Sequence, residues 1–147
     1  MSAQTASAPR TLWGGDVESA LSALDGEGGA MAARTEQWSA INSGSYEPAG
    51  LALMRDALSD ALASFPGETE RAPLAPSQRV RADGESETID HGAALRLRVR
   101  AQAPVQIALT GHFDTVFPAA HPFQSPWREN GMLRGPGVAD MKGGIAV

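Results

Sequence analysis

The chain has 147 residues and a hydrophobic fraction of 42%, which is enough apolar material for the core of one domain or of part of a larger one. A formal net charge of −5 and the lack of a basic patch argue against a nucleic-acid partner. The sequence contains no cysteine, which excludes disulfides and thiolate metal sites and leaves His, Asp and Glu as the ligands of any metal.

The N-terminal segment lacks the long apolar core of a secretory signal, and no run in the chain reaches transmembrane length. We interpret residues 1–15 as a flexible leader on a cytoplasmic protein with no membrane partner. The alternative, a processed N-terminus that precedes this sequence, stays open. Residues 16–147 then form one structural unit.

Helical patterns come first in this unit. Asp16 can cap a helix whose apolar residues lie one turn apart, namely Val17, Leu21 and Leu24. Breakers at 25–29 precede a second helical stretch over 30–41, although a single helix with a flaw is also compatible with the pattern. The sequence "NSGS" after this stretch favours a left-handed C-terminal cap.

The clearest helix follows, with apolar residues on one face at helical spacing: Leu51, Met54, Leu58, Leu62 and Phe65. Pro66-Gly67 ends this helix. We interpret the stripe as core packing and not as a binding groove.

The periodicity then changes to that of strands. A short edge strand is expected within 68–76, followed by a polar, turn-rich loop over 81–92. The sequence "AALRLRVR" at 93–100 alternates apolar and arginine side chains, as a strand with one exposed face does. The mostly apolar "VQIALT" at 105–110 predicts a more central strand. Two helices before a set of strands predict an α/β layered domain.

Two titratable residues directly follow the predicted central strand. His112 and Asp114 are two positions apart, so in a continuing strand their side chains share one face. In open α/β sheets, ligands bind beyond the C-terminal ends of the strands. A neutral imidazole there is a good zinc ligand, and a carboxylate beside it can orient the ring and raise its basicity. Gly111 allows the backbone to turn closely as the strand ends.

A second motif, "GPGVADMKGG", places one carboxylate among glycines. Asp140 lies where a loop enters a helix, and its oxygens can hold one divalent cation or bridge two cations about 3.5–4 Å apart. Each motif alone also has a simpler interpretation, as a hydrogen-bonded histidine at a strand end or as a helix cap with a solvated lysine. Together and in this order, the two motifs are much more specific evidence of a metal site than either motif alone.

The sequences "GHFDTVFP", "HPF" and "NGMLRGPGVADMKGGIAV" closely resemble the co-catalytic zinc exopeptidase and deacylase family. This family includes aminoacylases, acetylornithine deacetylase, succinyl-diaminopimelate desuccinylase and glutamate carboxypeptidases. The resemblance is strongest over 105–147, and residues 38–62 also resemble the family's opening helices. The "GPG" form favours the glutamate carboxypeptidase branch. The resemblance implies the N-terminal part of a zinc-peptidase-like α/β domain, with helices packed on a mixed, largely parallel sheet and the lid domain absent.

The resemblance also implies a role for each site residue. His112 becomes a ligand of one zinc, and Asp140 becomes the ligand that bridges two zincs. Asp114 becomes the active-site carboxylate that orients His112. The bond Asp140-Met141 becomes a candidate for the cis form, which is rare outside proline. Cobalt or manganese can occupy sites of this kind in place of zinc.

Three further polar residues are assigned no chemical role. Lys142 matches the family pattern, and we expect its role to be structural. His91 and His121 are interpreted as a loop residue and a turn residue, and not as ligands.

The function implied for the full-length parent is metal-dependent hydrolysis of an amide bond in a short peptide or N-acyl amino acid that carries a free carboxylate. Two zincs would lower the pKa of a bridging water to about 7, and a glutamate further along the chain would take its proton. The parent is expected to be a homodimer. Because the sequence stops at Val147, before the family's general base and remaining ligands, we expect a truncated and inactive fragment.

Two other functions are alternatives. The chain could be a non-catalytic remnant or an interaction module that keeps only the first half of the fold. A serine hydrolase that uses His112 and Asp114 is disfavoured, because the sequence has no Gly-x-Ser-x-Gly elbow. Such a triad would also have no need of Asp140 and its glycines.

Overall fold

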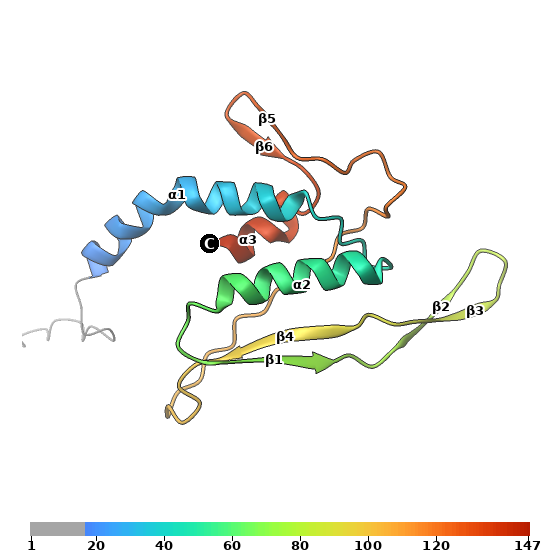
Figure 1. The fold of residues 1–147 in the computed structure, drawn as a ribbon, viewed down its shortest axis with the longest axis horizontal. Coiled ribbons are helices and arrows are strands. Elements are labelled where there is room, and N and C mark those ends of the chain that lie inside the picture. The colour runs from blue at the N-terminus through green and yellow to red at the C-terminus, as the bar shows by residue number, and fades with distance from the viewer. Residues whose placement is uncertain (1–16) are drawn as a thin grey trace, which may run out of the picture. The chain divides into compact units, whose positions relative to one another are not determined.

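A computed structural model of the protein describes residues 17–147 (Figure 1). The leader expected over 1–15 and the cap expected at Asp16 lie outside the described residues. The chain divides into two compact units, residues 1–30 and 31–147, and each is described by itself. In the first unit, the described residues form the beginning of helix α1, and three apolar side chains there are exposed: Val17, Leu21 and Leu24.

Helix α1 extends from Val17 to Ser39 without a break, so the single-helix alternative is the correct one. Each glycine weakens a helix by only about 1 kcal/mol relative to alanine, so the three glycines within 25–29 do not end it. The left-handed cap predicted at "NSGS" is wrong, because no residue from 40 to 45 has a positive φ. The side chain of Lys142 instead donates hydrogen bonds to Trp38 O in the last turn of α1 and to Ile41 O just after the helix.

Helix α2 extends from Pro48 to Leu62, with its proline in the first turn, where the missing N–H costs nothing. The stripe predicted to pack in the core is confirmed at Leu51, Met54 and Leu58, which are all buried. It is wrong at Phe65, which lies beyond the end of the helix and is 55% exposed.

The core of the second unit is small. Its buried members come from both helices and from the C-terminal end of the chain: Trp38, Met54, Leu58 and Ala146. Half-buried apolar residues pack around them: Ile41, Ala57, Ala61, Leu95, Phe113 and Ile145. Phe113 lies between the two titratable residues of the "GHFD" motif, so this motif is anchored directly on the core.

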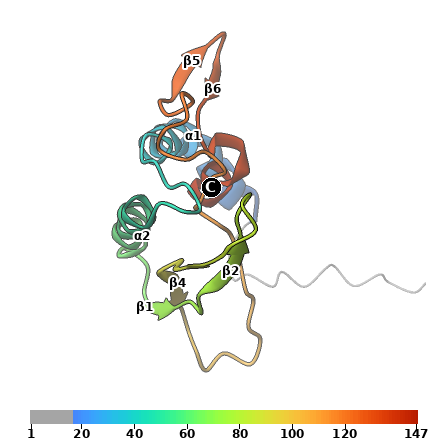
Figure 2. The same cartoon turned by 90° about the vertical axis from the view of Figure 1, so that its right-hand side faces the viewer.

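The longest strands confirm two predictions. Strand β1 (Glu68–Pro73) is the expected edge strand, and it pairs antiparallel with β4 (Ala93–Arg98). Leucines on β4 are half-buried and its arginines are exposed, as the alternating sequence predicts. Helix α2 contacts β4 and runs beside it in both views (Figures 1 and 2).

Two hairpins complete the strands. Strand β2 (Ser77–Val80) pairs with β3 (Ser86–Ile89), so the prediction of a loop over all of 81–92 is wrong. The turn is confined to a few residues around Gly84, whose φ of 87° suits glycine, and the β-branched side chains after it extend into a strand. Strand β5 (Trp127–Glu129) pairs with β6 (Met132–Arg134).

The coarse prediction of a mixed helix and strand architecture is confirmed, whereas the largely parallel sheet is not. Residues 17–147 contain three two-stranded antiparallel sheets and one isolated parallel bridge, Gly44↔Thr115. Residues 105–110, predicted as a central strand, form no strand, and Figure 1 draws them as a plain tube. Their apolar side chains are exposed: Val105, Ile107 and Leu109. A strand needs a paired neighbour, and none is present for this segment among the described residues.

The end of the chain confirms the predicted passage from a loop into a helix. The segment η1 (Val138–Lys142), kinked at Asp140 and Met141 where the backbone angles are not helical, leads into α3 (Gly143–Ala146). The peptide bond Asp140-Met141 is cis, as the sequence resemblance implied. Among residues 17–147, no helix is both long enough and apolar enough to cross a membrane.

Candidate functional site

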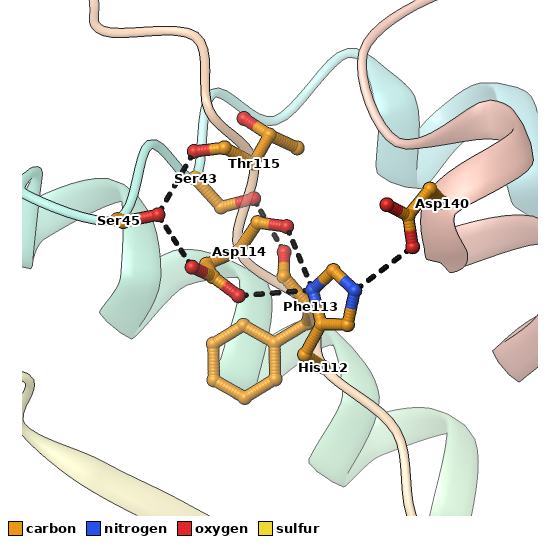
Figure 3. Close-up of polar contacts among 7 residues, drawn as sticks. All are labelled: Ser43, Ser45, His112, Phe113, Asp114, Thr115 and Asp140. Carbon is orange, nitrogen blue, oxygen red and sulfur yellow. Dashed lines mark hydrogen bonds and ion pairs between the residues drawn. The ribbon is translucent and has the colours of Figure 1, made fainter.

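The imidazole of His112 lies between two carboxylates (Figure 3). Its Nδ1 is 3.0 Å from Asp114 Oδ1, and its Nε2 is 2.9 Å from Asp140 Oδ1. His112 and Asp140 are 28 positions apart in the sequence, and the fold brings their side chains into contact. All three residues singled out from the sequence therefore meet in one place.

The two carboxylates stabilise the protonated form of the ring. The hydrogen bond with Asp140 raises the pKa of His112 above its usual value, partial burial opposes this, and the hydrogen bond with Asp114 raises the pKa further. Only an imidazolium donates to both carboxylates at once, because a neutral ring carries one N–H. The interaction therefore stabilises the fold at pH values below the usual histidine pKa and is lost as the pH rises through the raised pKa.

The three side chains open onto a pocket of about 300 Å³. Val116 and Phe117 give this pocket an apolar wall beside its titratable groups, a combination typical of small-molecule sites. Phe117 is also the first of three aromatic side chains in contact. The ring centroids of Phe117 and Phe123 are 4.8 Å apart, and those of Phe123 and Trp127 are 5.6 Å apart.

The loop before Asp140 depends on Gly137. This residue has a φ of 75°, a left-handed conformation that glycine adopts without strain. A side chain at this position would also meet Lys142, since an added Cβ would lie 2.8 Å from Lys142 Cδ. Glycine at this position therefore lets the backbone approach the Lys142 side chain closely.

Lys142 is fully buried, and it is the only lysine in the chain. Its Nζ donates hydrogen bonds to the backbone oxygens of Trp38, at 3.0 Å, and of Ile41, at 2.8 Å. Trp38 O belongs to the last turn of α1 and Ile41 O lies two residues beyond the end of this helix, where a cation also interacts favourably with the helix dipole. The structural role predicted for Lys142 is confirmed: it ties the "ADMK" turn to helix α1.

Sequence reasoning missed a second group of residues at the site. Ser43, Gly44 and Ser45, between α1 and α2, lie alongside Phe113–Thr115 (Figure 3). Ser45 N donates to Thr115 O at 2.9 Å, and Thr115 N donates to Ser43 O at 2.8 Å. The hydroxyl of Ser45 donates to Asp114 Oδ2 at 2.5 Å. The "NSGS" sequence was interpreted only as the end of a helix, and no local pattern announces a contact 69 positions away.

The other histidines lie outside the site, as predicted. His91 follows β3 in a loop, where its Nε2 is 2.8 Å from Ser77 Oγ. His121 lies in a turn and accepts a hydrogen bond from Phe123 N. Within residues 17–147, no group of three or more His, Cys, Asp or Glu side chains is arranged to hold a metal ion.

The donor pair nevertheless fits a divalent cation. Two donors on one tetrahedral zinc, each at about 2.0–2.1 Å, lie about 3.3 Å apart. His112 Nε2 and Asp140 Oδ1 are 2.9 Å apart, so a small movement would place a cation between them. Asp114 on the opposite nitrogen completes a carboxylate–histidine arrangement of the kind that orients metal-bound imidazoles.

Residues 108–147 match the family described as Peptidase family M20/M25/M40. This span includes His112, Asp114 and Asp140, the three residues that converge on the pocket. Over these residues the chain is similar to this peptidase family. The resemblance stated from the sequence motifs is thereby confirmed at the level of the M20 family.

Two curated relatives come from two strains of Mycobacterium tuberculosis and carry the provisional name succinyl-diaminopimelate desuccinylase. Each is 37% identical to this chain over 95 residues, which cover 61% of the chain and 26% of the relative. The chain thus spans about a quarter of the length of these M20-type relatives. No solved structure matches the chain significantly. These relatives do not confirm the glutamate carboxypeptidase branch, which stays a prediction.

Proposed function

We propose that the chain is the cation-holding part of a metal-dependent hydrolase, and that the whole protein cleaves an amide bond in a short peptide or an N-acyl amino acid. The observation that carries the proposal is the approach of His112 Nε2 to within 2.9 Å of Asp140 Oδ1, with Asp114 on the other ring nitrogen. The match of residues 108–147 to the M20 peptidase family supports both metal dependence and hydrolysis of a peptide or acyl amide.

His112 and Asp140 would hold the cation, through Nε2 and the carboxylate oxygens. The side chain of Asp140 is 85% exposed, which leaves its oxygens open to a second cation. We propose zinc, with two ions in the complete site and with cobalt or manganese as alternatives. A bound divalent cation lowers the pKa of a coordinated water and polarises the carbonyl of the scissile bond.

Asp114 acts on the site through His112. When its Oδ1 accepts the Nδ1 proton of a neutral ring, the lone pair of Nε2 is left free for the cation. Lys142 acts at greater distance, because its hydrogen bonds to Trp38 O in α1 and to Ile41 O just after this helix fix the turn that carries Asp140. Each of these groups positions a ligand, and none needs to move during the reaction.

The substrate and setting are proposals of the same kind. The relatives' printed name, a desuccinylase, is in line with removal of an acyl group, whereas the "GPG" form favours a carboxypeptidase. Both reactions cleave an amide bond, and we propose a substrate with a free carboxylate beside that bond. We further propose that the protein is cytoplasmic and that the whole protein is a homodimer.

The test uses the protein encoded by the complete reading frame. Hydrolysis of N-succinyl and N-acetyl amino acids and of short glutamate peptides is measured before and after removal of metal with a chelator. Activity that is lost with the chelator and restored by zinc, cobalt or manganese is expected. Asp140→Asn should lower kcat/KM at least about 100-fold, whereas Asp60→Asn, an exposed carboxylate on α2, should leave it unchanged. Hydrolysis that is indifferent to chelation would overturn the proposal.

The 147-residue chain by itself is proposed to be inactive. A zinc site with catalytic geometry needs three protein ligands, and the described residues bring together only His112 and Asp140. The rival proposal, a non-catalytic remnant or interaction module, predicts no chelator-sensitive hydrolysis by any length of the gene product.

A further inference from the structure

The carboxylate of Asp114 is held from both sides. Its Oδ1 faces His112 Nδ1 at 3.0 Å, and its Oδ2 accepts the hydroxyl proton of Ser45 at 2.5 Å (Figure 3). The side chain of Asp114 is 38% exposed, so burial alone does not fix the rotation of its carboxylate group. Ser45 is the side chain that occupies the second oxygen.

We propose that Ser45 is a positioning residue for the site. Its hydroxyl fixes the Asp114 carboxylate so that Oδ1 accepts from His112 Nδ1 and Nε2 is left for a cation. The inference rests on the proposed function, because an Nε2 without a proton matters only if it binds a metal ion. It assigns a role to a residue in the loop between α1 and α2, far from both sequence motifs.

The backbone holds Ser45 in place independently of its hydroxyl. Two backbone hydrogen bonds join Ser43 and Ser45 to Thr115 on the strand-like segment that carries Asp114. Gly44 between them packs tightly, since an added Cβ would lie 2.8 Å from Phe117 O. The hydroxyl of Ser45 can therefore be removed while the backbone that presents it stays in position.

The proton of Ser45 has two acceptors within reach. Thr115 O lies 3.2 Å from Ser45 Oγ, compared with 2.5 Å for Asp114 Oδ2. A hydroxyl donates one hydrogen bond, and a charged carboxylate is the stronger acceptor. The hydroxyl of Ser45 therefore donates its proton to Asp114 Oδ2, and this hydrogen bond keeps Oδ1 turned toward His112.

The two carboxylates compete for the single proton of a neutral His112. A proton on Nδ1 bonds the Asp114 carboxylate at 3.0 Å, with the backbone oxygen of Asp114 a longer second acceptor at 3.2 Å. A proton on Nε2 bonds Asp140 and blocks the nitrogen that a cation needs. Asp140 is 85% exposed and Asp114 is 38% exposed, so water weakens the Asp140 contact more. A carboxylate fixed by Ser45 shifts this balance toward the Nδ1–H tautomer.

The experiment is ¹⁵N NMR of the three histidines in the 147-residue chain, at a pH above that at which the His112 ring becomes neutral. The wild-type chain is expected to carry the proton of His112 mainly on Nδ1. Ser45→Ala is expected to raise the ratio of Nε2–H to Nδ1–H about fivefold, the effect of losing one hydrogen bond of ordinary strength. An unchanged tautomer ratio in Ser45→Ala would overturn the inference.

Two sets of variants separate positioning from general stability. Ser43→Ala removes a buried hydroxyl from the same loop, but that hydroxyl donates to Phe113 O, so it should lower the melting temperature and leave the tautomer ratio unchanged. Ser45→Thr and Ser45→Val have nearly the same shape and differ in one hydroxyl. The threonine variant should keep the wild-type ratio and the valine variant should not. Equal ratios in these two variants would contradict the role of the hydroxyl, even if Ser45→Ala folded poorly.

This test does not depend on hydrolysis. If the whole protein shows no chelator-sensitive activity but the tautomer ratio responds to Ser45, the proposed function fails and the positioning of Asp114 stands. If the protein is a metal-dependent hydrolase and the ratio does not respond, only the role of Ser45 is wrong.

Discussion

A buried lysine with neutral partners holds the site to the rest of the fold. The two acceptors of Lys142 are backbone oxygens, so no carboxylate compensates for the burial of its charge. Burial lowers the pKa of Lys142 to about 8 from the usual 10.5. Because the sequence has no other lysine, a single side-chain resonance reports on this group.

We predict that a ¹³C-labelled Lys142 side chain titrates with a midpoint near pH 8 in the folded chain. Below this pH the lysine is charged in both the folded and the unfolded state. Between about 8 and the usual 10.5, the unfolded chain binds more protons, so the free energy of unfolding should rise with pH. Lys142→Met should abolish this rise. A midpoint at the ordinary lysine value would show that Nζ is hydrated and contradict the buried position.

At the scale of single residues, the sequence predicted the titratable residues of the site better than the residues that hold them in place. His112, Asp114 and Asp140 carry recognisable motifs, and the structure brings them together. Ser45 was missed because serine is common in loops, and its partner Asp114 is distant in the sequence. Its pairing with Asp114 depends on the loop between two helices docking against another segment, which no local pattern encodes.

Helix α2 supplies the part of the core that the sequence predicted most reliably. Met54 is fully buried, whereas its sequence neighbour Leu53, about 100° further around the helix axis, is 64% exposed. We predict that Met54→Ala lowers the free energy of unfolding by about 2–5 kcal/mol, because it removes apolar contacts and leaves a cavity. Leu53→Ala should change it by no more than about 0.5 kcal/mol. Chemical denaturation measures both, and equal losses would mean that α2 does not pack as described.

Helices and strands that follow from the local periodicity of their own residues were predicted well. Elements that need pairing with a distant segment were not. The apolar period of α2 and the alternation of β4 are local properties, and both are found. Phe65 follows the same period but lies after the end of the helix, where the spacing no longer applies. The segment 105–110 has the composition of a strand, yet pairing is non-local, and no described strand lies beside it.

The molecule as a whole buries little apolar surface for its length. The buried hydrophobic residues of the described chain number five, and the apolar side chains of 105–110 face solvent. The site is nevertheless well connected, because Lys142 ties it to α1, Phe113 anchors it in the core and Ser43–Ser45 brace it. Three separate parts of the fold therefore support the site formed by His112, Asp114 and Asp140.

We propose above that His112 and Asp140 share a divalent cation. Zinc titration of the ¹⁵N-histidine-labelled chain tests this proposal most directly. Above the pH at which His112 becomes neutral, added zinc should shift the His112 resonances at lower concentrations than those of His91 and His121, which lie outside the site. Asp140→Asn should weaken this response at least about 10-fold, and Asp60→Asn should not change it. If zinc leaves His112 unshifted, or shifts it equally in Asp140→Asn, the account of this site as a metal centre is contradicted.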